Sequence, residues 1–190
     1  MKKITVYCGS NKGKDAAFEA GAKTLARELI KRNLELVYGA GKVGLMGIIA
    51  DEMLQAEMKV YGIIPQSLVD IEVAHQDLTE LTVVETMRDR KWLMAERGDG
   101  FIAMPGGIGT LEELFEIMTL NQLGYIQKPL ALYNVKGYYD KLLDFLGFSC
   151  QEGFLRQEQL DSLIVSGDAA QLLDQMAEFK PIYSPKWEIR

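Results

Sequence analysis

Residues 100–113 read GFIAMPGGIGTLEE, and this stretch decides the fold of the chain. The apolar run at 100–104 is typical of a buried strand, the three glycines that follow form a tight turn, and a helical pattern starts at Leu111. Glycine lets the backbone approach a ligand closely, and a helix N-terminus attracts anions through its free N–H groups and its dipole. The stretch therefore predicts a strand, a turn and a helix with the geometry of a phosphate site.

Two acids, Glu112 and Glu113, follow the turn on what this pattern predicts to be the first turn of the helix. A site that attracts both a phosphate and a carboxylate is suited to chemistry. A second interpretation stays open, because Thr110 and Glu113 also have the spacing of a capping box. In that case Thr110 is the N-cap, and Glu113 bonds back to the backbone of the cap.

Short apolar strands alternate with helices along the rest of the chain. Strands are predicted at 4–8, 34–38, 60–64, 81–84, 101–104, 128–133 and 163–165, and helices at 18–29, 45–58, 87–97, 111–123, 138–146 and 169–178. This order predicts a single α/β domain over residues 1–180, with a doubly wound, Rossmann-like, mostly parallel sheet that helices cover on both faces. Residues 66–80 are predicted to form a long surface loop, and residues 181–190 an extended tail.

The composition argues against several classes of partner. The chain has 190 residues, 48% of them hydrophobic and 25% charged, and a net charge of -6. A main partner such as nucleic acid or an anionic membrane would need a clustered basic surface. No run approaches the roughly 20 apolar residues of a membrane span, and the first strand ends too early to be a signal peptide. We expect a cytoplasmic protein.

The cysteines and the single histidine predict neither a disulfide nor a metal site. Cys8 and Cys150 lie far apart in apolar settings, and a chain without export signals keeps its thiols reduced. His75 has no partner at a metal-ligand spacing and is expected to be a loop histidine. The sequence therefore implies no metal.

Three glycine-rich turns, at 9–10, 39–44 and 105–110, follow predicted strands. In an open parallel sheet such turns gather at the carboxyl edge, near the point where the strand order reverses. The second turn has the G-x-G-x-x-G spacing of a dinucleotide site, but the strand at 60–64 lacks the acid that would bind the ribose. The P-loop pattern is also absent. A complete dinucleotide and a P-loop nucleotide are therefore disfavoured.

Residues 87–92, MRDRKW, place three cations at the start of a predicted helix. Two interpretations remain: a solvated basic face paired with Asp89 and Glu96, or cations that face a ligand phosphate or nearby acids. The large apolar residues Trp92, Phe115 and Met118 are expected in the core.

Three of these segments together resemble one family. The run PGGIGTLEE at 105–113, MRDRK at 87–91 and GAGKVGLMG at 39–47 are similar to motifs of the LOG (Lonely Guy) family, cytokinin riboside 5′-monophosphate phosphoribohydrolases often labelled lysine decarboxylases. The resemblance covers nearly the whole chain. It implies a doubly wound sheet, a homodimer with sites near the subunit interface, and hydrolysis of the N-glycosidic bond of a purine nucleoside 5′-monophosphate such as AMP, with a role in cytokinin biosynthesis.

The resemblance also assigns site residues. The catalytic arginine and glutamate of the family fall on Arg90 and Glu113. The positions implied to bind the substrate are Ser10, Gly41, Glu72, Met87, Arg88, Lys91, Gly106, Gly107, Ile108, Gly109, Thr110, Leu111, Glu112 and Thr119. The chain departs from the family at Arg88, where a histidine is usual, and at Ala40, where a glycine is usual. The first departure puts the preference between adenine and an N6-substituted adenine in question.

The implied reaction separates charge, leaving a cationic sugar and an anionic base, as in glycoside hydrolysis. Glu113 is expected to stabilise the sugar or to activate water, and Arg90 to bind phosphate or base and orient Glu113, because arginine is a poor acid. A non-catalytic carrier of a phosphorylated, molybdopterin-type pterin is the alternative, although it would not need this pair. A decarboxylase would need a pyridoxal phosphate lysine, for which Lys42, Lys59 and Lys91 offer no setting. No cofactor is therefore implied.

Overall fold

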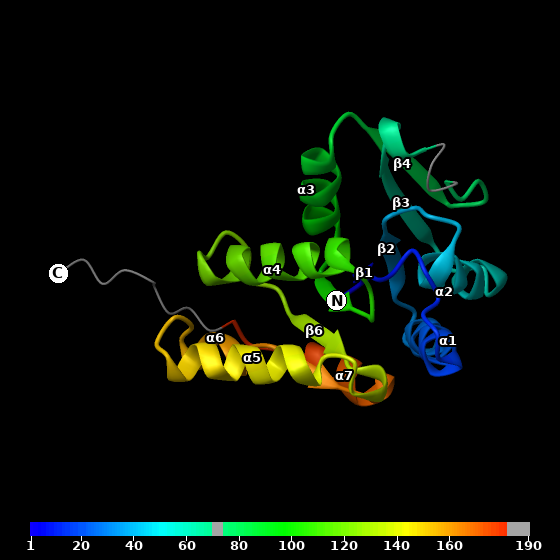
Figure 1. Ribbon diagram of the computed structural model, residues 1–190. Coiled ribbons are helices and arrows are strands. Elements are labelled where there is room, and N and C mark those ends of the chain that lie inside the picture. Colours follow the sequence, from blue (N-terminus) through cyan, green and yellow to red (C-terminus); the bar gives the residue numbers. More distant parts are fainter. Residues whose placement is uncertain (70–73, 182–190) are drawn as a thin grey trace.

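The computed structural model describes residues 1–69 and 74–181 (Figure 1). Within them, seven strands form one sheet: β1 (Lys3–Tyr7), β2 (Glu35–Tyr38), β3 (Val60–Pro65), β4 (Glu80–Val84), β5 (Gly100–Ala103), β6 (Leu130–Tyr133) and β7 (Ile164–Ser166). All neighbouring pairs are parallel, in the order β4-β3-β2-β1-β5-β6-β7. The chain builds outward from β1 to β4 and then crosses to β5. The strand order therefore reverses between β1 and β5, and the predicted doubly wound sheet is confirmed.

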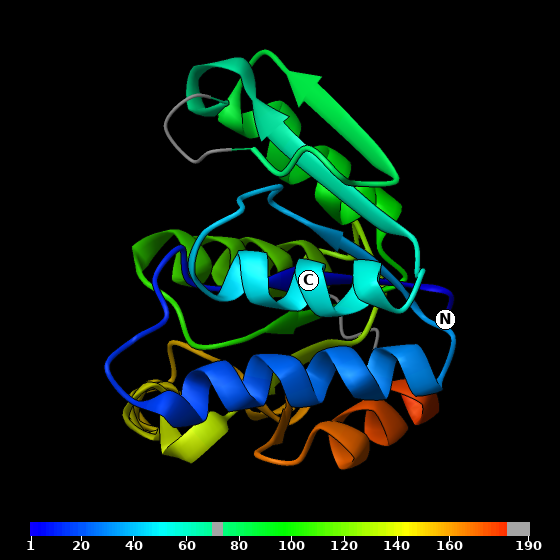
Figure 2. The ribbon, with the colours of Figure 1, turned by 90° about the vertical axis from the view of Figure 1, so that its right-hand side faces the viewer.

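Helices cover both faces of the sheet. They are α1 (Ala16–Lys31), α2 (Gly44–Gln55), α3 (Met87–Arg97), α4 (Ile108–Gln122), α5 (Asp140–Gln151), α6 (Gln157–Asp161) and α7 (Ala169–Glu178), with 3₁₀ turns η1 (Gln66–Leu68) and η2 (Val135–Gly137). Figure 2 shows α1, α2 and α7 in front of the sheet, and Figure 1 shows α3, α4 and α5 on the opposite side. The short α6 lies in a segment for which no helix was predicted.

The sheet separates two apolar cores. Ile4 and Val6 of β1 belong to the core under α1, α2 and α7, whereas Tyr7 belongs to the core under α3, α4 and α5. This alternation follows from the pleat, which points successive side chains to opposite faces. The central strands are buried on both faces, as parallel strands between helices must be, and β4 at the edge is the most exposed.

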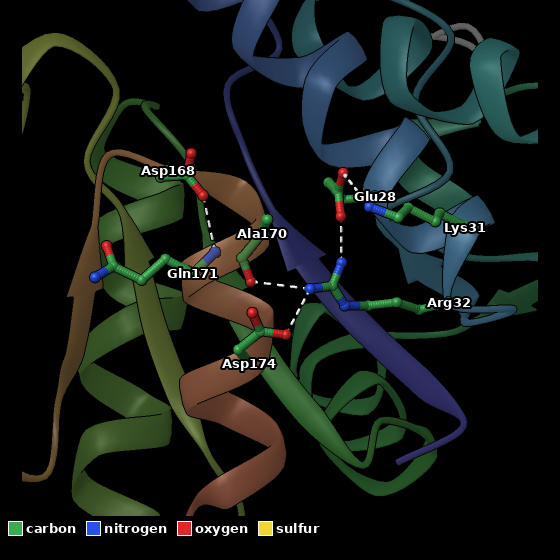
Figure 3. A network of polar contacts seen from close by, with 7 residues as sticks. All are labelled: Glu28, Lys31, Arg32, Asp168, Ala170, Gln171 and Asp174. Carbon is green, nitrogen blue, oxygen red and sulfur yellow. Dashed lines mark hydrogen bonds and ion pairs between the residues drawn. The ribbon is translucent and has the colours of Figure 1, made fainter.

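A polar network ties the two outer helices of the first face together (Figure 3). Arg32, at the C-terminus of α1, pairs with Glu28 one turn back and donates to Asp174 (2.6 Å) and to the carbonyl oxygen of Ala170 (3.1 Å) on α7. These partners lie up to 142 residues away in the sequence. The network therefore fixes the last helix against the first.

The predicted loop at 66–80 is more ordered at its end than a surface loop would be. Ala74 and His75 are buried, and Ala74 forms an isolated bridge with Gly41. The expectation of a simple surface loop is therefore wrong for these two residues. The predicted tail, beyond residue 181, lies outside the described residues.

Candidate active site

The three glycine turns meet at the carboxyl edge of the sheet, as the sequence predicted. The N–H of Gly9 donates to the carbonyl of Pro105 (3.1 Å), and the N–H of Leu45 donates to the carbonyl of Gly9 (3.0 Å). A Cβ on Gly106 would lie 2.9 Å from the nitrogen of Gly9, and one on Gly44, whose φ is +63°, would collide with the backbone of Ser10. The turn at 9–10 therefore lies between the turns at 39–44 and 105–110. Side chains at Gly44 and Gly106 would prevent this close approach of the backbones.

The N-terminus of α4 is open. Its N-cap is Gly107, whose residue type provides no side-chain cap, and Ile108 is 82% exposed. A Cβ added to Gly107 or Gly109 would meet no atom within 4 Å. The first N–H groups of a helix have no partner within the helix, so this end has the features of an anion site.

The helix begins three residues earlier than predicted, and this changes the roles of its acids. The first turn of α4 contains no acid, so Glu112 and Glu113 lie on the second turn. Thr110 is inside the helix and buried, with its side chain packed against Gly106. It therefore does not serve as the N-cap, and the capping-box interpretation of Glu113 is wrong.

Glu113 lies beside the carboxyl end of β1. Burial raises the pKa of Tyr7 well above its ordinary value, and the negative charge of Glu113 raises it further. The same two causes, burial first, raise the pKa of the Cys8 thiol. Glu113 is half-buried. The charge of Glu113 thus acts at the carboxyl end of β1, where Tyr7 and Cys8 stay protonated.

Arg90 reaches the same place from α3. The side chain is only 5% exposed; its Nε donates to the carbonyl of Ile63 (3.1 Å) and its Nη2 to the carbonyl of Gly39 (2.8 Å). Its positive charge lowers the pKa of Tyr7, opposing Glu113. A Cβ on Gly39 would collide with the guanidinium. Arg90 is therefore fixed across the ends of β2 and β3, and its charge acts on the same Tyr7 hydroxyl as the charge of Glu113.

The start of α3 is set by a cap that the sequence reading missed. The hydroxyl of Thr86 accepts a bond from the N–H of Asp89 (3.1 Å) and donates to the Asp89 carboxylate (2.6 Å). Thr86-x-x-Asp89 is close to the capping-box pattern and could have been recognised. This cap fixes where α3 begins and thus which side of it Arg90 occupies.

Lys91 joins α3 to α4. Its Nζ pairs with Glu112 and with Glu116 (3.2 Å). Burial alone would lower the pKa of Lys91, but the two carboxylates outweigh burial and raise the pKa above its ordinary value. The interpretation that paired the basic run with Asp89 and Glu96 is therefore wrong for Lys91, since nearby acids of α4 are its partners.

A cavity of about 460 Å³ lies beside these pairs, between α3 and α4. It is lined by Arg88, Asp89, Lys91, Trp92, Ala95, Glu116 and Leu120. Trp92 is 58% exposed and Phe115 is 37% exposed, so the expectation that both lie in the core is wrong, while Met118 is half-buried against the core. Their helices are packed on the sheet by other residues, such as Met94 and Leu114.

The remaining predicted contacts divide into three groups. Ser10, Gly41 and residues 106–111 lie on the converging turns and the first turn of α4, and Met87 lies at the start of α3, where its sulfur accepts from Arg90 (3.7 Å). Thr119 lies roughly 16 Å along α4 from Ile108, at about 1.5 Å per residue. Glu72 lies outside the described residues.

Two tyrosines that the sequence reading did not select support the last glycine turn. The hydroxyl of Tyr138 donates to the carbonyl of Gly106, and that of Tyr139 donates to the carbonyl of Met104, both at 2.6 Å. They come after η2, the short turn that follows β6, and the carboxyl ends of parallel strands share one edge. That position could have identified them.

Residues 1–69 and 74–181 contain no group of three or more potential metal ligands. None of the helices in these ranges is long and apolar enough to cross a membrane.

Comparisons with known proteins agree with this architecture. A family model described as "possible lysine decarboxylase" matches residues 46–176. The chain is 40% identical to cytokinin riboside 5′-monophosphate phosphoribohydrolase LOG5 of Arabidopsis thaliana, over 100% of this chain and 85% of that protein. It is 41% identical to the phosphoribohydrolase LOG of Oryza sativa subsp. japonica, over 96% of this chain and 76% of that protein.

Solved structures share the fold at low identity. A molybdenum cofactor binding protein from the phototrophic bacterium Rippkaea orientalis superposes with a TM-score of 0.70 at 18% identity, covering 93% of this chain and 96% of that one. The molybdenum cofactor carrier protein of Chlamydomonas reinhardtii has a TM-score of 0.69 at 16% identity, covering 94% and 99%. At this identity the likeness concerns the fold alone.

Proposed function

The chain belongs to the LOG family, and we propose that it hydrolyses the N-glycosidic bond of a purine nucleoside 5′-monophosphate to free base and ribose 5-phosphate. Relatives that carry the name of this activity match nearly the whole chain at 40% identity and above. The observation that carries the proposal is one constellation. The open N-terminus of α4 and the half-buried Glu113 lie at the carboxyl edge of the sheet beside β1, where the strand order reverses, and the buried Arg90 lies at the neighbouring strands β2 and β3.

The glycine turns hold the 5′-phosphate. The first N–H groups of α4 and the positive end of its dipole favour an anion there, and the chain's net charge of -6 makes a local anion site necessary. The hydroxyls of Tyr138 and Tyr139 hold the carbonyls of Gly106 and Met104, and this leaves the N–H groups of the turn for the phosphate.

Glu113 acts on the sugar. Cleavage of the bond from C1′ to the base develops positive charge on the ribose, which a carboxylate stabilises. Glu113 lies on the second turn of α4, one turn beyond the phosphate end, and so on the side where a nucleotide anchored by its phosphate extends. It also accepts the proton of the attacking water as general base.

Arg90 orients this carboxylate. A guanidinium keeps its proton, so Arg90 does not supply a proton to the leaving base. Two backbone carbonyls hold it in place, and its charge acts on the same buried hydroxyl as the charge of Glu113. We assign Arg90 to electrostatic control of Glu113 and of the charge that develops on the substrate.

Arg88 is the residue that sets the base preference in this proposal, together with Glu72. Arg88 lines the cavity between α3 and α4 and stands where the family usually has histidine. A cytokinin-type base and plain adenine differ only at N6, so the base preference depends on the side chains that surround that atom. A part in cytokinin biosynthesis follows if the N6-substituted base is preferred. The cytoplasmic location stays a prediction of the sequence.

A homodimer completes the proposal. Large apolar side chains are exposed on α3, α4 and α5, and these helices lie on one side of the sheet (Figure 1); the side chains are Met87, Trp92, Ile108, Phe115, Phe145 and Phe148. Large apolar side chains exposed on helices of the same side are typical of a protein interface. A second copy on this face would cover the cavity that contains Arg88 and Lys91.

The carrier and decarboxylase alternatives are less well supported. Likeness to molybdenum cofactor carriers is a likeness of fold, at 16% and 18% identity. A Schiff-base lysine must lose its proton to attack a carbonyl, and Lys91 is held protonated by two carboxylates. The hydrolase needs neither a pterin nor a pyridoxal cofactor.

The proposal is tested by incubating the purified protein with AMP, isopentenyladenosine monophosphate, GMP and CMP, and measuring free base and ribose 5-phosphate. Adenosine, which lacks the phosphate, is the matched control. We expect both products from one or both adenine nucleotides and almost none from adenosine. Absence of base release from all four nucleotides would reject the hydrolase and favour the carrier.

A further inference from the structure

The single histidine of the chain, His75, lies beside the candidate site without belonging to the predicted set. It is 2% exposed, and the elements around it are α2, the turn at 39–41 and the segment that follows residue 73. We propose that His75 is a positioning residue for the reaction, which acts by holding the turn whose carbonyl orients Arg90. This inference rests on the proposed function, because that function places Arg90 in the reaction.

The imidazole is bonded at both nitrogens. Its Nε2 lies 2.9 Å from an Asp51 carboxylate oxygen on α2, and its Nδ1 accepts the N–H of Asp77 (3.2 Å). A nitrogen that accepts carries no proton, so the neutral ring has its proton on Nε2 and donates it to Asp51. The ring therefore connects the segment 74–77 to α2.

The backbone of the same segment holds the glycine turn. The N–H of His75 donates to the carbonyl of Ala40 (2.9 Å), and Ala74 forms a bridge with Gly41. Ala40 has a φ of +63°, in the left-handed region that residues with a Cβ avoid. Such a conformation persists only where neighbouring groups fix it. His75 and Ala74 are the neighbours that do so.

The turn at 39–41 also fixes Arg90. Gly39 directly precedes Ala40, and its carbonyl accepts from Nη2 of Arg90 (2.8 Å). If Ala40 relaxes toward an ordinary φ, the peptide unit between Gly39 and Ala40 rotates and this carbonyl turns away. Arg90 would then lose one of the two carbonyl anchors that hold its guanidinium across the ends of β2 and β3.

Three variants separate the contact of His75 with Asp51 from its contact with Asp77. His75→Asn keeps an acceptor near the Asp77 N–H, His75→Gln keeps a donor near Asp51, and His75→Ala keeps neither. Thr79→Ala is the matched control, because the Thr79 hydroxyl accepts the N–H of Val60 (3.0 Å) at the far end of the same segment. We expect His75→Ala to lower kcat by about 10- to 100-fold, as small misplacements at a site do. The Asn and Gln variants recover part of this loss, and the control stays near the parent.

Two readouts distinguish positioning from a loss of folding. Solvent exchange of the Arg90 Nη2 protons, which donate to the Gly39 carbonyl, should accelerate in His75→Ala and not in Thr79→Ala, as followed by NMR. In a double-mutant cycle, adding His75→Ala to Arg90→Lys should cost much less than it costs alone, since contributions through a shared group are not additive.

The proposal is wrong if His75→Ala keeps kcat within about threefold of the parent and leaves the Arg90 N–H protected. Should the alanine variant not fold, the Asn and Gln variants decide by the same two readouts. If the parent protein releases no base, the proposed function fails. The exchange measurement then still decides whether His75 positions Arg90.

Discussion

Glu112 and Glu113 are neighbours in the sequence but lie in different surroundings. Glu112 is exposed and pairs with Lys91, on the side of α4 that faces α3. Glu113 is half-buried and acts on Tyr7 and Cys8 at the end of β1. A rotation of about 100° per residue around the helix is enough to separate them. Of the two acids, Glu113 is the one that we propose to act on the sugar.

Glu113→Gln removes the charge and keeps the shape. We expect kcat to fall by about 10² to 10⁴ while AMP binding, measured by calorimetry, changes little, because in the proposed complex the backbone of the glycine turn holds the phosphate. Glu152→Gln, at the exposed C-terminus of α5, is the control. Turnover close to that of the parent would remove Glu113 from the chemistry.

Tyr138 contributes to the proposed phosphate turn through one hydrogen bond, from its hydroxyl to the carbonyl of Gly106. Tyr138→Phe removes the donor to the Gly106 carbonyl and keeps the ring that packs edge-on against Phe18 and Tyr139. A lost bond at this half-exposed position weakens the phosphate turn by about 1 kcal/mol. KM for AMP should therefore rise about fivefold with kcat nearly unchanged. A fall in kcat with constant KM would contradict a role in binding, and Tyr125→Phe provides the exposed control.

At the scale of elements, capping decides where the side chains of the proposed site lie. Both α3 and α4 begin at the carboxyl edge of the sheet. The side chain of Thr86 caps α3, whereas α4 begins at Gly107 without a side-chain cap. The cap of α3 fixes the start of the helix that buries Arg90. The uncapped start of α4 leaves backbone N–H groups that can bind an anion.

The opposite edge of the sheet contributes a stability that depends on pH. Asp99, before β5, accepts the N–H groups of Lys2 (2.6 Å) and Lys3 (2.9 Å) at the start of β1. Burial alone would raise the pKa of Asp99, but these N–H donors and the nearby N-terminal amine lower it below its ordinary value. A lowered pKa stabilises the fold above about pH 4, and this stabilisation is lost as the pH falls through the folded pKa.

Asp99→Asn should therefore destabilise the protein at neutral pH, by about 1 kcal/mol or less because the site is exposed. The decrease of Tm between about pH 5 and about pH 3 should also become smaller than in the parent. Thermal denaturation across this range measures both effects, with Asp144→Asn on α5 as control. An unchanged slope would show that Asp99 does not contribute to acid sensitivity.

At the scale of the whole molecule, the two faces of the sheet differ. On one face, Arg32 and its partners tie α1 to α7 (Figure 3). On the opposite face, where α3, α4 and α5 lie (Figure 1), large apolar side chains are exposed. Burying such residues between two copies would remove this apolar area from water. The second face is the one that the proposed homodimer uses.

Trp92→Glu tests the proposed dimer. A charge buried in an apolar interface is costly, so we expect a protein that elutes as a dimer to become a monomer. Ala20→Glu, on the exposed side of α1, introduces the same charge on the other face and should leave the dimer intact. Size-exclusion chromatography with light scattering measures the mass of each; a parent that is monomeric at all concentrations rejects the dimer.

The sequence by itself determined the parallel sheet and the edge that carries the site. Strand and helix periods depend on local patterns, so the helices at 87–97 and 169–178 match their predicted bounds. The glycine turns were predictable for the same reason, because a turn that needs close backbone approach excludes a side chain. The family motifs then pointed to Arg90 and Glu113.

Only the tertiary structure decided which cation is buried, where α4 begins and which aromatic residues are exposed. Arg90 is held by carbonyls 51 and 27 residues away, and no local pattern distinguishes it from Arg88 or Lys91. Thr110 packs against Gly106 and so does not cap the helix that its sequence pattern predicted. Local patterns fix periodicity, but burial, capping and electrostatic partners depend on residues that meet only when the chain is folded.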